Sequence, residues 1–343
     1  GATWGFGLVD TMEAQHGVAC DACGTSAGYL ELISNDGGRD KRTVYASGCP
    51  NHYSYCTGKP GVAGCGGVGE EGSATEATLQ AATFELPARP VLIVAPSEYT
   101  NLLCNRGAIG VALNGASILS GALDPSCAQL SVPSDAATAA WQTIDFCGGS
   151  LGISGEYGYR VAPSCLVAQA RQAGHAAADG HSPQVGWALD GFPVYGPHGP
   201  GGREMVHAAQ GCVGSICLDE CSGMPGELPG VDGFKYRYYL AGALSDGHSL
   251  PVSPRPGARD APFTMHCHRG CTWHELRLRL PKCSGGLGVV DGYVPQAHAG
   301  LGGAVYTSGA AVEKQRRCSE YYGLFEPANV SAPWSREWGG DAN

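Results

Sequence analysis

The chain has 343 residues, 43% of them hydrophobic, which is enough to bury a sizeable core. Only 15% of the residues are charged, the formal net charge is −10 and no basic cluster occurs. Phosphate backbones and anionic membranes would repel such a chain, so no nucleic acid is expected as a partner. The most apolar run, residues 90–96, is far shorter than the about 20 residues of a membrane-spanning helix, so no membrane span is expected.

Sixteen cysteines indicate the compartment in which the protein works. Thiols in such number are typical of oxidising compartments, where they pair as disulfides, and they are rare in the cytosol. We therefore expect a secreted, extracellular protein with most or all of its cysteines oxidised in pairs. The disulfide candidates are Cys20, Cys23, Cys49, Cys56, Cys65, Cys104, Cys127, Cys147, Cys165, Cys212, Cys217, Cys221, Cys267, Cys271, Cys283 and Cys318.

Two features of the chain ends fit secretion. The chain begins with Gly1 rather than methionine, as it would after cleavage of a signal peptide, although an arbitrary boundary would look the same. Near the other end, Asn329 opens the sequon Asn-Val-Ser and is the expected glycosylation site.

The first half of the chain predicts β-strands separated by loops. Residues 1–40 show little periodicity and contain Cys20 and Cys23, for which a structural disulfide is favoured over a redox centre or half of a zinc site. Strands are expected at residues 42–47, 82–86 and 90–95. A hairpin is expected at residues 109–118, where Asn114-Gly115 accepts the positive φ of a tight turn.

The second half predicts another hairpin and the few helices. Short helices are expected over residues 136–144, capped by Ser134-Asp135, over the alanine-rich stretch 163–178, and over 311–322. The stretch 184–197, QVGWALDGFPVYGP, predicts a hairpin about Asp190-Gly191 whose return strand Pro193 restricts to an edge or a bulge. An aromatic strand is expected at residues 236–240 and an open, Gly-rich stretch at 284–310.

These elements predict a mainly β fold: a single large β-rich domain, sandwich-like, with many loops, a few short helices and multiple disulfides. The core is expected over residues 41–283. It would carry an N-terminal disulfide-containing extension over 1–40 and a Gly-rich C-terminal extension with a short helix over 284–343. The two hairpins would form its centre, with Trp187 and Phe192 facing inward. Their similarity could reflect a duplication or coincidence, because the matching positions are too few to decide.

Four motifs resemble, in their order, those of the YHYH-domain family over roughly residues 40–280. They are GCPNH at 48–52, IGVALNG at 109–115, GWALDGFPVYGP at 186–197 and CLDEC at 217–221. The resemblance implies a secreted protein of a family suspected of binding metal. It gives these family-motif residues: Asn51, His52, His181, Asp190, Gly191, Phe192, Pro193 and Tyr195.

The family is named for a Tyr-His-Tyr-His string preceded by a Cys-Gly-Gly-His step. Here the step ends in serine and the string reads Tyr-Gly-Tyr-Arg, so both tyrosines remain and the histidines do not. Two histidines at i and i+2 of a strand could share a metal, whereas glycine offers no donor and arginine is always cationic. We therefore expect a degenerate site without metal, made of Ser150, Tyr157, Gly158, Tyr159 and Arg160.

Arg160 brings a fixed charge to the place of an imidazole. It could pair with the carboxylate of Asp190 or of Asp145, which would turn a metal site into a salt bridge. It could equally lie exposed at the surface. The sequence favours neither outcome.

Residues 148–152, GGSLG, also spell the nucleophile-elbow pattern of hydrolases, with His175 or His181 as the nominal base. That pattern works on a sharp turn between a strand and a helix, and here glycines continue instead of a helix. No catalytic residue is assigned, and an enzyme is the less favoured interpretation.

The densest group of metal-type side chains lies between residues 265 and 275. His266, His268 and His274 could hold copper or zinc together with the sulfurs of Cys267 and Cys271. In a secreted chain the two cysteines are more readily explained as disulfide partners.

Two classes of function remain. The favoured one is a structural or interaction glycoprotein of an extracellular surface or fibre, which has no cofactor and binds protein partners or copies of itself. The alternative is an extracellular copper- or zinc-binding protein or metalloenzyme that uses His52, His181 and the histidines between 266 and 274.

Overall fold

The computed structural model describes residues 29–50, 77–78, 80, 82–105, 107–121, 147–152, 155–175, 177–207, 212, 214, 216–240, 263–298 and 300–301. Several expected features lie outside these residues: Asn51, His52, Asp145, Asn329, the helices over 136–144 and 311–322, and Cys20, Cys23, Cys56, Cys65, Cys127 and Cys318.

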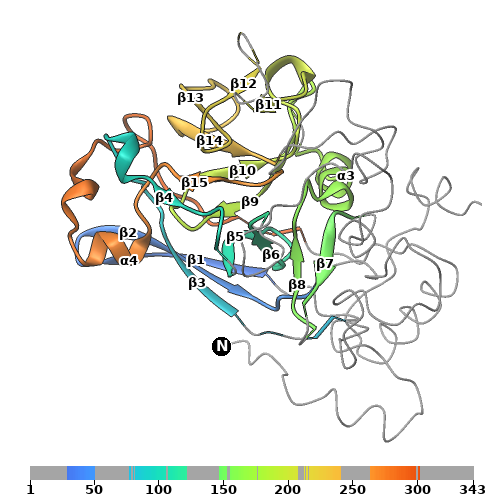
Figure 1. Ribbon diagram of the computed structural model, residues 1–343, viewed down its shortest axis with the longest axis horizontal. Helices are drawn as coiled ribbons and strands as arrows, with labels where there is room; N and C mark the ends of the chain where they lie inside the picture. Colours follow the sequence, from blue (N-terminus) through green and yellow to red (C-terminus); the bar gives the residue numbers. More distant parts are fainter. Residues whose placement is uncertain are drawn as a thin grey trace, which may run out of the picture.

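A mixed sheet of eight strands forms the body of the described fold (Figure 1). From one edge to the other, its strands are β13 (Gly223–Pro225), β14 (Tyr236–Tyr239), β10 (Pro193–Tyr195), β9 (Gln184–Ala188), β5 (Ala108–Ala112), β6 (Ser117–Leu119), β8 (Tyr157–Tyr159) and β7 (Gly149–Leu151). The two expected hairpins, β5–β6 and β9–β10, occupy the centre and pair with each other through β5 and β9. Trp187 and Phe192 are buried, as predicted.

A second sheet covers part of the first and makes the fold sandwich-like. It consists of β1 (Tyr29–Asp36), β2 (Arg39–Ala46) and β3 (Ala82–Pro87), all antiparallel. Val44 of β2 and Leu86 of β3 belong to the same buried cluster as Val111 and Val185 of the large sheet. The two sheets therefore share one core, and the fold is mainly β.

Short elements complete the described structure. Two-residue strands form the pairs β4 (Thr100–Asn101) with β15 (Cys267–His268) and β11 (Val206–His207) with β12 (Cys217–Leu218). The helices are α3 (Ser164–Gln172) and α4 (Trp273–Arg277), with single 3-10 turns at Pro96–Glu98, Pro200–Gly202 and Pro281–Ser284. No helix in the described part of the chain is long and apolar enough to cross a membrane.

Two expected elements differ from the structure, and a third, the return strand of the second hairpin, shows the bulge and not the edge position of its two expected forms. Residues 90–95 form no strand, since only Val91 and Leu92 make isolated bridges, one to Leu287 and one to Gly270. The helix predicted over 163–178 ends at Gln172, because Gly174 takes a φ of +80° that ends the turn. Strand β10 lies inside the sheet rather than at its edge; Pro193 is its first residue, and a bulge follows at Val194 and Tyr195.

The expected domain boundaries fall within packed structure. The boundary at residue 40 lies inside the β1–β2 hairpin. The segment after residue 284 bridges to Val91 and Phe234 and buries Val289 and Leu301. Residues on both sides of each boundary thus contribute to the same core.

Ten cysteines lie in the described part of the chain, and all ten are disulfide-bonded. The bridges with both ends described are Cys147–Cys165, Cys212–Cys217, Cys221–Cys267 and Cys271–Cys283. Cys267 and Cys271 are therefore bridge cysteines rather than metal ligands.

Candidate functional site

The residues of the Tyr-Gly-Tyr-Arg string lie at one end of the large sheet. Strand β7 supplies Ser150, which pairs directly with Gly158 on β8. Arg160, two residues further, donates from Nε to Ser150 Oγ at 3.0 Å and from Nη1 to the carbonyl of Ser120 at 3.3 Å. The pairing and the hydrogen bond bring together the three positions at which the family carries imidazoles.

The space beside Gly158 is already filled. A Cβ added at Gly158 would meet Leu119 Cδ1 at 2.5 Å, so the leucine side chain packs against the bare glycine backbone. Burial lowers the pKa of the Arg160 guanidinium, an effect that the Glu156 carboxylate opposes. From this partly desolvated position the guanidinium donates to the Ser150 hydroxyl and the Ser120 carbonyl.

The expected pairing of Arg160 with Asp190 is wrong. Asp190 lies at the β9–β10 turn, where its Oδ2 accepts hydrogen bonds from the Tyr238 hydroxyl at 2.6 Å and from the Gly270 amide at 2.9 Å. Full exposure of Arg160 is also wrong, because the side chain is largely buried. The other proposed partner, Asp145, lies outside the described residues.

The two tyrosines of the string are core residues. Tyr157 and Tyr159 are both buried and pack edge to face with 5.4 Å between ring centroids. The amide of Asn114, at the turn of the first hairpin, donates to the Tyr159 hydroxyl at 2.8 Å. The string therefore anchors the β5–β6 hairpin to the edge of the sheet.

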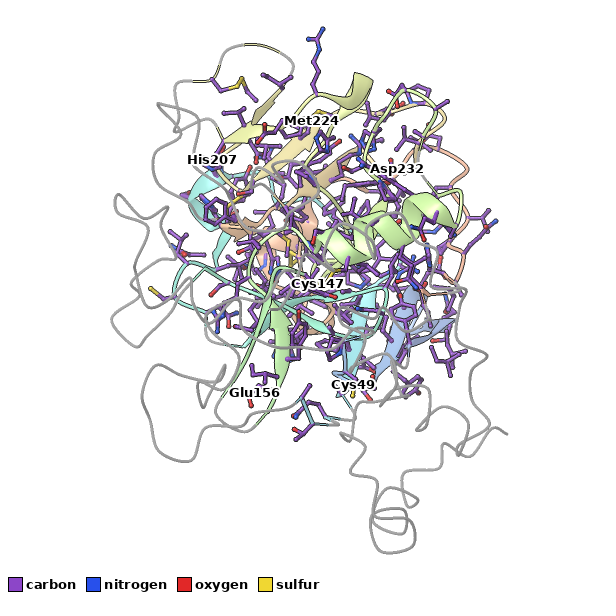
Figure 2. All side chains as sticks on the ribbon, turned by 90° about the vertical axis from the view of Figure 1, so that its right-hand side faces the viewer. Cys49, Cys147, Glu156, His207, Met224 and Asp232 are labelled. Atoms are coloured by element: carbon purple, nitrogen blue, oxygen red, sulfur yellow. A yellow bond between two sulfur atoms is a disulfide. The ribbon has the colours of Figure 1, made fainter. Side chains whose placement is uncertain are left out.

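A second Tyr-x-Tyr string occupies β14, Tyr236-Arg237-Tyr238-Tyr239, and its arginine is fully buried. Arg237 donates from Nε and Nη2 to the two oxygens of Asp232, each at 3.0 Å. The Tyr195 hydroxyl donates to the same carboxylate at 2.9 Å. Met224 and Asp232 mark this end of the molecule, opposite to Glu156 beside the first string (Figure 2).

His181 belongs to the second string rather than the first. Its Nδ1 lies 2.7 Å from the Ser182 carbonyl, which can only accept, so Nδ1 carries the proton. Nε2 then accepts from the Tyr239 hydroxyl at 2.8 Å. Burial lowers the pKa of His181, which keeps the imidazole neutral.

The hydrolase arrangement is not formed. Ser150 lies within β7 and leads into β8, so no helix follows it. Its Oγ accepts from Arg160, while both nitrogens of His181 are engaged at the second string. His175 is exposed, with its ring 5.8 Å from that of His298.

The three histidines proposed as metal ligands do not converge. His268 is buried with Nε2 3.2 Å from the Ile109 carbonyl, and His266 stacks on His207 with 4.3 Å between ring centroids. His274 is exposed on α4. Among the residues that the structure describes, no group of three or more His, Cys, Asp or Glu side chains is arranged to hold a metal.

One cluster of polar groups was not predicted from the sequence, because its members come from distant segments. The Arg269 guanidinium lies 4.7 Å from the centre of the Tyr99 ring and forms a 3.7 Å ion pair with Glu220. Next to it, Asp219 accepts from the Tyr236 hydroxyl at 2.9 Å, and burial raises the pKa of its carboxyl. Only the CLDEC motif, which contains Asp219 and Glu220, could have pointed to this place.

Comparison with known proteins gives one match. Residues 83–209 match the family described as YHYH protein, a segment that includes both central hairpins and the first string. No curated protein and no solved structure matches the chain. The match to the YHYH protein family thus falls on residues 83–209, which include the centre and one end of the large sheet.

Proposed function

We propose that the protein is an extracellular structural or interaction protein in which the family's histidine site has become a packed contact without metal. The observation that carries this proposal is the hydrogen bond of Arg160 to Ser150, next to a Gly158 whose vacant side-chain space Leu119 fills. Three imidazole positions are thereby occupied by a hydroxyl, a backbone and a cation, none of which suits a metal ion.

The disulfides support the extracellular part of the proposal. Every described cysteine is bonded, and the bridge Cys221–Cys267 ties segments that are 46 residues apart. Such bridges form and persist in oxidising compartments. Glycosylation at Asn329 belongs to the same proposal.

Metal analysis tests the degenerate site. After dialysis against a chelator and reloading with Zn²⁺ or Cu²⁺, we expect no retained metal in the natural protein. The variant L119A/S150H/G158H/R160H restores three imidazoles and removes the obstructing leucine, so it should retain close to one equivalent. A control with asparagine at the same three positions should retain none. Stoichiometric metal beside Tyr157 and Tyr159 in the natural protein would overturn the proposal.

The interaction part of the proposal rests on apolar side chains exposed on the smaller sheet. Leu30 and Leu32 of β1 are 37% and 48% exposed, and Tyr45 of β2, directly opposite Leu30, is 43% exposed. Strand β1 is also the edge strand of its sheet. Exposed apolar side chains on an edge strand favour pairing with another chain.

Sedimentation over a range of concentrations tests this surface. We expect the natural protein to associate and the variant L30S/L32S to associate less, because the apolar area available for contact is lost. The matched control is Val94→Ser, which changes an apolar side chain that is 76% exposed outside the strands of the smaller sheet. A natural protein that stays monomeric at high concentration contradicts self-assembly.

A further inference from the structure

The two halves of the large sheet have the same arrangement of strands, counted from the centre to each edge. Each half contains a hairpin at the centre (β5–β6 or β9–β10), then a strand parallel to the second hairpin strand (β8 or β14), then an antiparallel edge strand (β7 or β13). Figure 1 shows β7 and β8 at one end of the sheet and β13 and β14 at the other.

The residue registers of the two halves also correspond. Ile118 pairs with Tyr159 in one half, as Val194 pairs with Tyr238 in the other. At the edges, Ser150 pairs with Gly158 as Met224 pairs with Arg237.

The central pairing shows where the two halves meet. Across β5 and β9, Gly110 faces Ala188 and Ala112 faces Gly186, while Val111 faces Trp187. A half-turn about the Val111 and Trp187 pair therefore exchanges the two strands.

The sequence repeats at the same places. GVALNG at 110–115 corresponds to GWALDG at 186–191, DFCGG at 145–149 to DECSG at 219–223, and YGYR at 157–160 to YRYY at 236–239. Each short match is weak alone. Their common order, and the identical registers of the strands that carry them, make coincidence a poor explanation.

Equivalent side chains make equivalent contacts. The turn residue of each hairpin contacts the second tyrosine of its own string: Asn114 with Tyr159 at 2.8 Å and Asp190 with Tyr238 at 2.6 Å. Oδ1 of each turn residue also accepts from the backbone amide two residues on, at 3.2 Å from Ala116 and 3.4 Å from Phe192.

Glycines at equivalent places meet equivalent tyrosines. Gly149 and Gly223 each lie so close to the first tyrosine hydroxyl of their string that no Cβ would fit. The two halves are therefore alike in the side-chain contacts that hold the string against the edge strand.

We infer that the large sheet is one four-stranded unit present twice, and that Tyr236-Arg237-Tyr238-Tyr239 is a second copy of the family string. The protein thus carries two equivalent string sites at opposite ends of one sheet. In the second site, Met224, Arg237 and Tyr239 take the places of Ser150, Gly158 and Arg160. The inference rests on register and contacts, so it stands independently of the proposed function.

The second site is closed by an arginine, as the first one is. Arg160 is held by Ser150, and Arg237 is held by Asp232, although the arginine stands at the fourth position of one string and the second position of the other. The second copy thus holds its arginine in a salt bridge, at other positions than the salt bridge that the sequence suggested for Arg160. Neither copy offers an imidazole from within its own string.

Exchange of the turn residues in the full chain tests the equivalence. Asn114→Asp and Asp190→Asn each install the residue of the other copy, and Asn114→Leu and Asp190→Leu are volume-matched controls without hydrogen-bonding groups. In thermal unfolding we expect each leucine variant to lose about 5 °C or more and each exchange variant to lose clearly less than the leucine at its position. An exchange as damaging as leucine at either position counts against the duplication.

An experimental structure of the natural protein gives the second readout, which does not depend on the folding of any variant. Superposing β5, β6, β8 and β7 on β9, β10, β14 and β13 should require a rotation near a half-turn and should place Tyr157 on Tyr236 and Tyr159 on Tyr238. In an Asn114→Asp structure, the new carboxylate should accept from the Tyr159 hydroxyl as Asp190 accepts from Tyr238. A rotation far from a half-turn, or a shift of register between the halves, would overturn the inference.

Discussion

At the scale of single residues, one buried ion pair lies at the contact between the two sheets. Arg42 of β2 is paired with Glu31 of β1, and its guanidinium lies 3.7 Å from the centre of the Trp187 ring on β9. The Trp187 indole in turn donates to Glu31 at 3.1 Å. Burial lowers the pKa of Arg42 to about 10, so the side chain stays protonated at neutral pH.

Removing one partner of this pair should be costly. Arg42→Met leaves the Glu31 carboxylate buried without its cation, and we expect a loss of about 3–5 kcal/mol in the free energy of unfolding, measured by urea denaturation. The double variant E31M/R42M replaces both charges by apolar groups and should lose much less. A double variant that is no better than the single one would show that the ion pair itself stabilises the sheet contact.

The ion pair of Arg42 with Glu31 could not be predicted from the sequence. Residues 29–36 were not expected to form a strand, so Glu31 had no predicted neighbour. The partners of Arg160 and Asp190 were missed for a related reason: Asp190 belongs to one hairpin and Arg160 to the other end of the sheet. Which residue a charged side chain pairs with depends on the order of the strands in the sheet, and local sequence patterns do not predict that order.

At the scale of elements, local sequence signals were sufficient to predict the two central hairpins. Asn114-Gly115 and Asp190-Gly191 supply the turn conformation, and Gly115 and Gly191 take φ values of +89° and +86°. The three-residue strands β7 and β8 and the two-residue strands carry too few residues for a periodic pattern. They exist because distant partners satisfy their backbone groups.

Replacement of Gly191, at the turn of the second hairpin, should strongly destabilise the fold. An alanine there would be strained by the positive φ, and its Cβ would collide with the Pro87 carbonyl of β3. We expect Gly191→Ala to lower the free energy of unfolding by at least about 3 kcal/mol. The matched control is Gly37→Ala, whose φ is +61° but whose Cβ would meet nothing within 4 Å, with an expected loss of about 1–2 kcal/mol. Equal losses at the two positions would exclude the contact with Pro87 as the cause.

At the scale of the whole molecule, the expected strands and hairpins predicted a mainly β fold, and the cysteine content predicted its disulfides. They could not predict that segments on both sides of the expected core join it. Gly300 shows why: its φ of +77° lets the chain pass beside Tyr29 and Leu113, a contact between the two ends of the described chain that no local pattern reveals. The two string sites likewise become comparable only once the sheet places them at its opposite ends.

Neutral histidines in buried or half-buried positions should make the whole fold sensitive to acid. Burial lowers the pKa of His298 to about 4, and lowers the pKa values of His181, His198 and His207 as well. The unfolded chain binds these protons near pH 6.5 while the folded chain does not. The histidine contribution is therefore complete above about pH 6.5 and is lost as the pH falls through the window toward 4.

One buried carboxyl opposes this trend. Burial raises the pKa of Asp219, so its folded form binds a proton before the unfolded form does and gains stability on acidification. Four histidines outweigh one carboxyl, so the free energy of unfolding should fall between about pH 6.5 and 4.5. For the partly buried His298, solvent screening limits the expected share to the order of 1 kcal/mol.

Urea unfolding at several pH values measures the effect. The variant His298→Asn keeps an acceptor for the Gly300 amide, which donates to Nδ1 at 3.1 Å, and removes the titrating group. It should show a shallower loss of stability on acidification than the natural protein. His274→Asn, at an exposed position on α4, is the matched control and should leave the slope unchanged. A free energy of unfolding that is constant or rises as the pH is lowered through this window would show that the buried imidazoles do not govern the acid response.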